Sequence, residues 1–259
     1  MNTFRALQRV VMSIRSARGR SFWITIDRPK KKNAISPAMY DDICAAMDAA
    51  EENEETFITV FTGEGEFYSS GQDLSAITPD AAHKDYDAGY SKWIKRLIEH
   101  KNLLVALVNG PSIGIACVTL SLMDYVVCSD QAYFLTPFAS LGIGPEGCAS
   151  KTFIDIMGQS RAAEMLYFGW RLPAEKALKY GFVGKVFPND QFRQKTEELI
   201  DELCKLPRHS TLASKQICRP EEWRMNMKAV WDREYANLKR MIMSEETQNI
   251  AVERMMSKM

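Results

Sequence analysis

Short apolar runs alternate with helical segments from Phe22 to about residue 187, and this alternation constrains the fold more than any other feature. Leu103–Val108 is apolar at every position, which is typical of a strand buried on both faces of a parallel sheet. The predicted strands from Phe22 onward are Phe22–Asp27, Phe57–Phe61, Leu103–Val108, Tyr125–Cys128, Ala132–Thr136 and Val183–Phe187. Val10–Ser13 and Ser21–Asp27 are predicted to pair as a β-hairpin. Because helical segments separate most of these strands, we predict βαβ units and an α/β fold.

Helix signals give the boundaries of the chain's parts. Ser36 is a typical helix cap, and the next residue, Pro37, suits the first helical position. The pair therefore predicts a helix start. Beyond Lys151 the chain is mainly helical, and Ser160 is expected to cap one of these helices. The predicted helices cover residues 86–100, 115–123, 161–168, 173–181, 191–205, 210–218 and 222–256, the last broken near Ser244. We expect a flexible extension over residues 1–9, a core over 10–190 that opens with a β-hairpin, and a helical region over 191–259.

Composition excludes several classes of function. Lys plus Arg and Asp plus Glu each number 33, so the net charge is zero and the basic excess of a nucleic-acid-binding protein is missing. No apolar run approaches the ~18 residues of a membrane-spanning helix. The six cysteines contain no CxxC, and with the three scattered histidines they form no metal-ligand spacing. We predict a protein of a reducing compartment that holds no metal and no disulfide framework.

Two glycine-containing loops follow predicted strands and could bind an anion. Ser69–Leu74 comes after Phe57–Phe61, and Asn109–Ile115 comes after Leu103–Val108. Ligands of parallel α/β sheets bind at the carboxyl ends of strands, where small residues let a ligand approach the backbone. Each loop alone is also consistent with a plain turn. Together they could aim two backbone N–H groups at one oxygen and form an oxyanion hole.

Glu146 is a lone acid in the segment Phe138–Ser150, and no other Asp or Glu lies between Asp130 and Asp155. Composition alone favours a loop-tip acid in water, but burial would raise its pKa and suit it to proton transfer. The same segment matches GxGxxG at Gly142–Gly147, a weak sign of dinucleotide binding. Glu146 argues against that alternative, because it would place a negative charge where a pyrophosphate belongs.

Several motifs, taken in order, resemble the crotonase (enoyl-CoA hydratase/isomerase) superfamily. Within it the segment Thr136–Cys148, with Pro145-Glu146-Gly147, is most similar to the peroxisomal Δ3,Δ2-enoyl-CoA isomerases. The motifs that carry the wider resemblance are Asp27-Arg28-Pro29, Asn33-Ala34-Ile35, Phe67–Leu74, Ala106–Pro111, Asp124, Ser129-Asp130 and Ala132-Tyr133-Phe134. The resemblance implies a spiral of ββα units with a helical C-terminal trimerisation region, and residues 10–190 as the acyl-CoA-binding core.

The resemblance also implies roles for individual residues. Glu146 takes the place of the single catalytic acid, and the backbone N–H groups of Gln72 and Ile115 form the oxyanion hole; other members often have Gly where this chain has Ile115. The two glutamates with which hydratases of the family add water are replaced by Val118 and Phe138. The expected substrate-binding residues are Ser70, Gly71, Asp73, Leu74, Gly114, Phe138, Leu141, Lys31 and Lys32. Lys31 and Lys32 would meet CoA phosphates, although a solvated charge cluster explains them equally well.

The implied activity shifts the double bond of a 3-enoyl-CoA, cis or trans, to trans-2-enoyl-CoA in the β-oxidation of unsaturated fatty acids, without a cofactor, in a homotrimer or hexamer. The alternatives are another crotonase reaction, such as hydration or thioester hydrolysis, and a non-catalytic acyl-CoA-binding protein. Ser257-Lys258-Met259 differs from the peroxisomal signal Ser-Lys-Leu by one residue and predicts recognition by the peroxisomal import receptor. The arginine-rich first 26 residues leave a mitochondrial location as the alternative.

Overall fold

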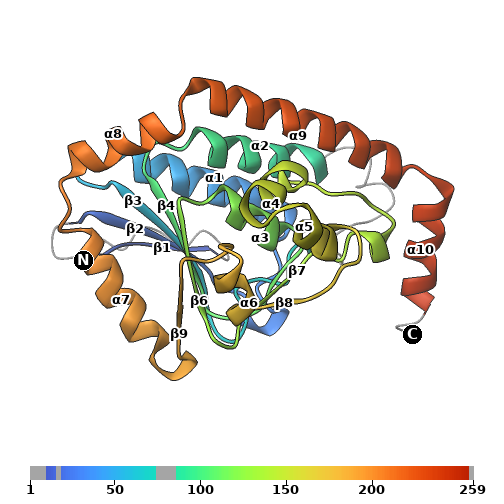
Figure 1. Cartoon of the computed structure of the whole chain (residues 1–259), viewed down its shortest axis with the longest axis horizontal. Coiled ribbons are helices and arrows are strands. Elements are labelled where there is room, and N and C mark those ends of the chain that lie inside the picture. Colours follow the sequence, from blue (N-terminus) through green and yellow to red (C-terminus); the bar gives the residue numbers. More distant parts are fainter. Residues whose placement is uncertain (1–9, 16–18, 74–85, 257–259) are drawn as a thin grey trace.

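The computed structural model describes residues 10–15, 19–73 and 86–256. A six-stranded sheet runs through the molecule in the order β1-β2-β3-β4-β6-β9 (Figure 1). Its strands are β1 (Val10–Arg15), β2 (Ser21–Ile26), β3 (Ile58–Gly63), β4 (Leu103–Val108), β6 (Tyr125–Ser129) and β9 (Lys185–Phe187). The β1–β2 pair is antiparallel, and every other pair is parallel. The predicted hairpin and parallel α/β sheet are therefore confirmed; the hairpin turn, residues 16–18, lies outside the described residues.

Side chains of the sheet alternate between two apolar clusters, as the period of two along a strand requires. Ile24, Phe61 and Ala106 face the larger cluster, together with residues of α1 (Pro37–Glu52) and α2 (Tyr86–Glu99). Val60 and Leu107 face the smaller cluster, which α7 (Phe192–Leu203) covers from the other side. Figure 1 shows α1 and α2 beside the sheet with α9 across them, and α7 apart from these three.

A second sheet contains three short strands in the order β5-β7-β8. They are β5 (Ser112–Ile113), β7 (Tyr133–Leu135) and β8 (Leu172–Pro173), of which β5 and β8 are too short to give a sequence signal. Along the chain, the segments that connect these strands contain the helices α3 (Ile115–Val118), η4 (Thr119–Leu122), η5 (Ala139–Leu141), α4 (Ala149–Met157) and α5 (Gln159–Leu166). The single helix expected over 115–123 is thus two consecutive short helices, α3 and η4.

The C-terminal part is helical, as predicted. After α6 (Ala174–Lys179) and β9 come η6 (Asn189–Gln191), α7, α8 (Arg208–Cys218), α9 (Glu221–Ile242) and α10 (Glu245–Met256), so the break near Ser244 is confirmed. The long α9 runs along α2 and reaches α4, and α10 turns away at its end (Figure 1). No helix within the described residues is both long and apolar enough to span a membrane.

Two expected helix caps are wrong in detail. Ser36 precedes α1 but its hydroxyl makes no capping hydrogen bond, so Pro37 alone marks that start. Ser160 lies inside α5, whose cap is Gly158 with a φ of 80°. A left-handed backbone at Gly158 ends α4 and begins α5 without a gap, and glycine adopts that conformation at little cost. The short turn η1 (Pro29–Lys31) precedes α1.

Candidate active site

The two glycine loops predicted from the sequence lie side by side. Ser69 and Ser112 form a parallel bridge, and the N–H of Ile113 donates to the carbonyl oxygen of Ser69 at 3.0 Å. Gly71 has a φ of 84°, and a Cβ at this position would lie 2.6 Å from the carbonyl oxygen of Ile113 and 3.7 Å from Cα of Gly114. The loops touch at this point because Gly71 has no side chain.

The backbone N–H groups of Gln72 and Ile115 come directly after these two glycines. Within the described part of the chain neither has a backbone acceptor, whereas the N–H of Gly114 donates to Leu135 at 2.8 Å. Gly114 carries the positive φ, 58°, and Ile115 begins α3 with ordinary helical backbone. The left-handed geometry that an isoleucine tolerates poorly therefore falls on Gly114, and isoleucine is compatible with this site. Donors at the ends of two adjoining loops suit a negatively charged oxygen.

Glu146 is buried, with 9% of its surface exposed, so the solvent-facing alternative is wrong. Burial raises the pKa of its carboxyl to about 8; the nearby Tyr90 hydroxyl opposes this rise, and the negative charge of Glu234 adds to it. A carboxyl with a pKa near neutrality can both accept and return a proton, as a general base and acid must.

Glu146 is joined to the second glycine loop through α3. Gly147, the next residue, has a φ of 65°, and a Cβ there would lie 2.5 Å from Cγ2 of Val118. Val118 ends the short helix that Ile115 begins, three residues earlier. The backbone that follows Glu146 therefore packs against the last residue of α3, the short helix whose first residue, Ile115, has the free N–H group.

The loop that leads to Glu146 starts at Phe138 and is held from two sides. Phe138 is fully buried, and its carbonyl oxygen accepts the N–H groups of Leu141 and Ile143 at 2.9 Å and 3.1 Å. The hydroxyl of Thr247 on α10 donates to the carbonyl oxygen of Gly142 at 2.6 Å. The C-terminal helix thus packs on the loop that carries the acid.

The remaining expected binding residues lie around the first loop. The N–H of Ser70 donates to the carbonyl oxygen of Lys32 at 2.9 Å, so the lysine turn adjoins this loop, and the side chains of Lys31 and Lys32 are exposed. Asp73 is nearly buried and forms an ion pair with Arg28 at 3.0 Å, which fits a structural role. Leu74 lies outside the described residues.

Known proteins are similar in sequence to this chain along most of its length. The model of the family described as "Enoyl-CoA hydratase/isomerase" matches residues 21–257. The chain belongs to the enoyl-CoA hydratase/isomerase family. It is 41% identical to "Enoyl-CoA delta isomerase 2" of Rattus norvegicus over 231 residues, which are 87% of this chain and 59% of that protein. It is 42% identical to "Enoyl-CoA delta isomerase 3, peroxisomal" of Mus musculus over 204 residues, which are 77% of this chain and 64% of that protein.

The chain thus spans about three fifths of the length of these relatives. The fold agrees with solved structures: an enoyl-CoA hydratase/isomerase from Pseudoalteromonas atlantica T6c superposes with a TM-score of 0.89 at 24% identity, over 96% of this chain and 98% of that one. The crotonase-type fold predicted from the motifs is therefore confirmed. The described residues contain no group of three or more His, Cys, Asp or Glu side chains able to hold a metal ion.

Two residues of this family member's site were not identified from the sequence. Tyr90 lies in the predicted helix over residues 86–100 and was not linked to Glu146, yet its hydroxyl lowers the pKa of that acid. Glu234 lies 86 residues after Cys148, and its carboxylate accepts the backbone N–H of that residue. An exposed-looking acid on a long charged helix gives no local signal of burial, so only the tertiary contact reveals Glu234.

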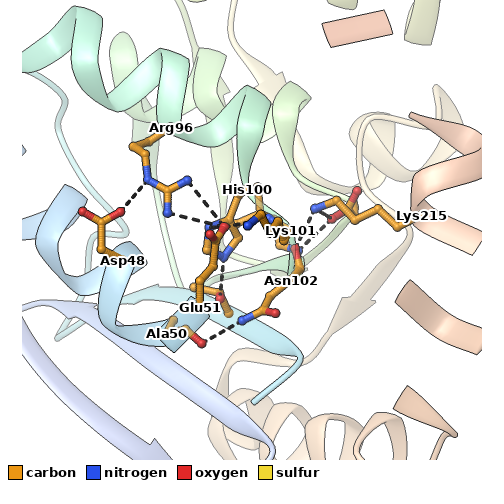
Figure 2. Close-up of polar contacts among 11 residues, drawn as sticks. Asp48, Ala50, Glu51, Arg96, His100, Lys101, Asn102 and Lys215 are labelled. Carbon is orange, nitrogen blue, oxygen red and sulfur yellow. Dashed lines mark hydrogen bonds and ion pairs between the residues drawn. The ribbon is translucent and has the colours of Figure 1, made fainter. Parts of the chain in front are cut away.

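A second group of buried and partly buried ionisable side chains includes Glu51, Arg96, His100 and Lys215 (Figure 2). His100 has Nδ1 2.8 Å from Oε1 of Glu51 and Nε2 2.8 Å from the hydroxyl of Thr59. Burial alone would raise the pKa of Glu51, but the His100 contact, the N–H of Lys101 and the charge of Arg96 lower it to about 2.

This group extends to the C-terminal helices. Nζ of Lys215 on α8 donates to the carbonyl oxygen of Asn102 at 2.6 Å and pairs with Asp124 at 2.7 Å (Figure 2). Asp124 also pairs with Arg219 at 3.2 Å. We call the side chains of Glu51, Arg96, His100, Asp124, Lys215 and Arg219 the paired cluster. Since each charge in it meets an opposite charge, it fastens α8 to the core.

Proposed function

We propose that this protein shifts the double bond of a 3-enoyl-CoA to trans-2-enoyl-CoA, with Glu146 as the group that moves the proton. The observation that carries the proposal is the burial of Glu146, with a pKa raised to about 8, directly before a glycine that packs against the helix begun by Ile115. The names of the relatives, both enoyl-CoA delta isomerases, support the same reaction.

The reaction needs one group that takes a proton and gives it back. Ionised Glu146 removes a proton from C2, and the electron pair delocalises through the thioester to form a dienolate. The protonated carboxyl then returns a proton to C4, which leaves the double bond between C2 and C3 and restores the carboxylate. General acid–base help of this kind contributes about 10²- to 10⁴-fold in rate.

The dienolate carries negative charge on the thioester oxygen. In this proposal the N–H groups of Gln72 and Ile115 donate to that oxygen. Support comes from their lack of backbone acceptors among the described residues and from the contact between their loops. Loss of one such donor costs about 10²- to 10³-fold in kcat in other enzymes. The hydroxyl of Tyr40 donates to Oε1 of Gln72 and so holds this loop from α1.

Hydration is a poorer match. By resemblance to hydratases of the family, the two acids that activate water would stand at Val118 and Phe138, and both side chains are apolar and fully buried here. Of the acids to which the resemblance gives a catalytic role, Glu146 is the one this chain has, which suits isomerisation. Gly71, Ser70, Gly114, Phe138 and Leu141 are the proposed acyl-thioester contacts; Asp73 supports its loop through Arg28.

The test compares wild type with Glu146→Gln on a 3-enoyl-CoA and, separately, on a 2-enoyl-CoA. We expect kcat for isomerisation to fall about 10²- to 10⁴-fold in the variant. Exposed Glu175, replaced by Gln, is the matched control and should keep wild-type activity. For wild type, kcat/KM should rise with pH through about 8, as Glu146 becomes the ionised base. Full activity of Glu146→Gln, or rapid hydration without isomerisation, contradicts the proposal.

We further propose a peroxisomal location, an import signal at Ser257-Lys258-Met259, and a trimeric or hexameric assembly through residues 191–259. The first is supported by the word "peroxisomal" in the name of the mouse relative. The signal lies outside the described residues, as does the extension over residues 1–9. Removal of Ser257–Met259 from a fluorescent fusion should disperse it from peroxisomes, whereas an unchanged distribution contradicts the signal. Light scattering of the purified protein measures the assembly.

A further inference from the structure

The turn between Glu146 and α4 has an unusual backbone. Gly147 and Cys148 are both left-handed, with φ of 65° and 68°, and Cys148 is one of only three residues other than glycine with positive φ in the described part of the chain. A residue other than glycine adopts this conformation at a cost in free energy, so neighbouring groups must hold the backbone of Cys148 in place. The direction in which Glu146 points depends on this turn.

Glu234 on α9 holds the turn through two hydrogen bonds. Its Oε2 accepts the N–H of Cys148 at 2.6 Å, and its Oε1 accepts the N–H of Ser150 at 2.8 Å. The side chain is 4% exposed, and no ion pair to it is recorded among the described residues. Both N–H groups belong to the start of the nine-residue helix α4, where negative charge is favoured.

The same face of α9 reaches Glu146 by a second route. Trp231 lies three residues before Glu234, so both project from one side of the helix. Its ring packs edge-on against Tyr90, with centroids 5.0 Å apart, and the Tyr90 hydroxyl lowers the pKa of Glu146 against the effect of burial. The indole N–H of Trp231 donates to the hydroxyl of Ser91 at 3.1 Å, which fixes the ring on α2.

We propose that Glu234 is a positioning residue for the isomerase reaction: its carboxylate fixes the left-handed turn at Cys148, and thereby the orientation of Glu146. The proposal rests on the proposed function. Glu234 touches no reacting atom; it acts through the backbone of Cys148 and Ser150. An α9 side chain thus makes the C-terminal region part of the active site.

A second effect of Glu234 is electrostatic and gives the test its specificity. The charge of Glu234 adds to the rise in the pKa of Glu146, while the hydroxyl of Tyr90 opposes it. Burial raises the pKa of Glu234 itself; the N–H groups of Ser150 and Cys148 and the charge of Arg233 oppose that rise. Removal of the charge at Glu234 should therefore lower the pKa of Glu146, whereas a merely structural loss would leave it unchanged.

The experiment compares Glu234→Gln with wild type in the full chain. An amide offers one oxygen where the carboxylate offers two, so one of the two N–H bonds is lost. We expect kcat on a 3-enoyl-CoA to fall about 10- to 100-fold, KM to change little, and the acid limb of kcat/KM to move to lower pH. The matched control is Glu222→Gln, which removes one exposed charge from the same helix. A wild-type kcat and pH profile in Glu234→Gln overturns the proposal.

A second variant and a second readout cover failure of the first. Glu234→Asp keeps the charge but shortens the side chain, so kcat should fall while the acid limb stays nearer to wild type. Amide hydrogen exchange at Cys148 and Ser150 should quicken in both variants, and unchanged exchange overturns the proposal without any reference to activity. If wild type isomerises no 3-enoyl-CoA, the proposed function fails, and the exchange result still decides whether Glu234 holds the turn.

Discussion

Glu146 is buried and Glu51 is partly buried, yet their pKa values move in opposite directions. Glu146 rises to about 8 and Glu51 falls to about 2. Burial acts on both in the same sense, so it does not explain the difference. Glu51 has Arg96, His100 and a backbone N–H around it (Figure 2). Among the described residues, the groups that act on Glu146 are the hydroxyl of Tyr90 and the like charge of Glu234.

The difference shows how one fold holds two kinds of carboxyl. Where donors and cations surround the group, the ionised form is stabilised and the side chain serves as a structural link. Where they are few, the proton is retained near neutral pH and the group becomes able to exchange it. The stability of the protein should therefore depend on the paired cluster, and its activity on the unpaired acid.

The largest effect on stability should come from breaking the paired cluster at Asp124. Asp124→Asn leaves the buried Lys215 without its anion, and loss of one partner of a buried pair costs about 3 to 5 kcal/mol. Chemical denaturation measures this, and the activity of the folded fraction should stay at the wild-type level. Exposed Asp201→Asn is the control. Equal stability of Asp124→Asn and wild type would mean that the cluster does not fasten α8.

Glu146→Gln should instead increase the free energy of unfolding at pH 8. The pKa of Glu146 is about 8 in the folded protein and near 4.5 in the unfolded chain. The contribution of Glu146 to the stability of the folded state is therefore fully present below pH 4.5 and declines as the pH rises to about 8. Glutamine removes this decline, and the gain should reach about 2 to 4 kcal/mol at pH 8 and vanish near pH 4.5. Denaturation of both proteins across that range tests it; a pH-independent difference contradicts the raised pKa.

Glu51→Gln should destabilise the protein by a smaller amount. The folded pKa of Glu51, about 2, lies below its unfolded value, so its stabilisation is present above pH 4.5 and is lost as pH falls toward 2. With solvent screening of this partly exposed group, we expect a loss of about 1 to 2 kcal/mol at pH 7. The loss should shrink between pH 4.5 and pH 3. Its exposed neighbour Glu52, changed to Gln, should show neither effect.

The smallest effect, a change in KM, should come from exposed charges that are buried neither in the candidate active site nor in the paired cluster. Replacement of Lys31 and Lys32 by Gln should raise KM for a CoA thioester a few-fold, about 1 kcal/mol or less, with kcat unchanged. Added salt should remove the difference, because exposed charges are screened. The steady-state kinetics at two ionic strengths measure this, and an unchanged KM at low salt shows that the lysines do not meet the phosphates.

Much of the fold was predictable because its signals are local. The apolar run at Leu103–Val108 predicted a buried central strand, and β4 lies inside the parallel sheet. The helix break near Ser244 was equally clear. Strands β5 and β8 were not predicted, since two residues carry no periodicity, and Ser160 was misplaced as a cap because Gly158 already ends one helix and starts the next.

The candidate site was only partly predictable. Gly71, Gly114 and Glu146 stand out in the sequence through small residues and an isolated acid. Tyr90 and Glu234, which act on that acid, come from helices far away in sequence and look like an ordinary core residue and an ordinary surface charge.

The sequence by itself determined which residues form strands and helices, where the glycine loops lie, and that Glu146 stands alone among apolar neighbours. Only the tertiary structure decided that Glu146 is buried and holds its proton near neutral pH. The physical reason is that a pKa depends on the water, charges and hydrogen bonds within a few ångströms, and here these come from α2 and α9. The chain supplies the acid, and the packing of distant helices around it raises its pKa.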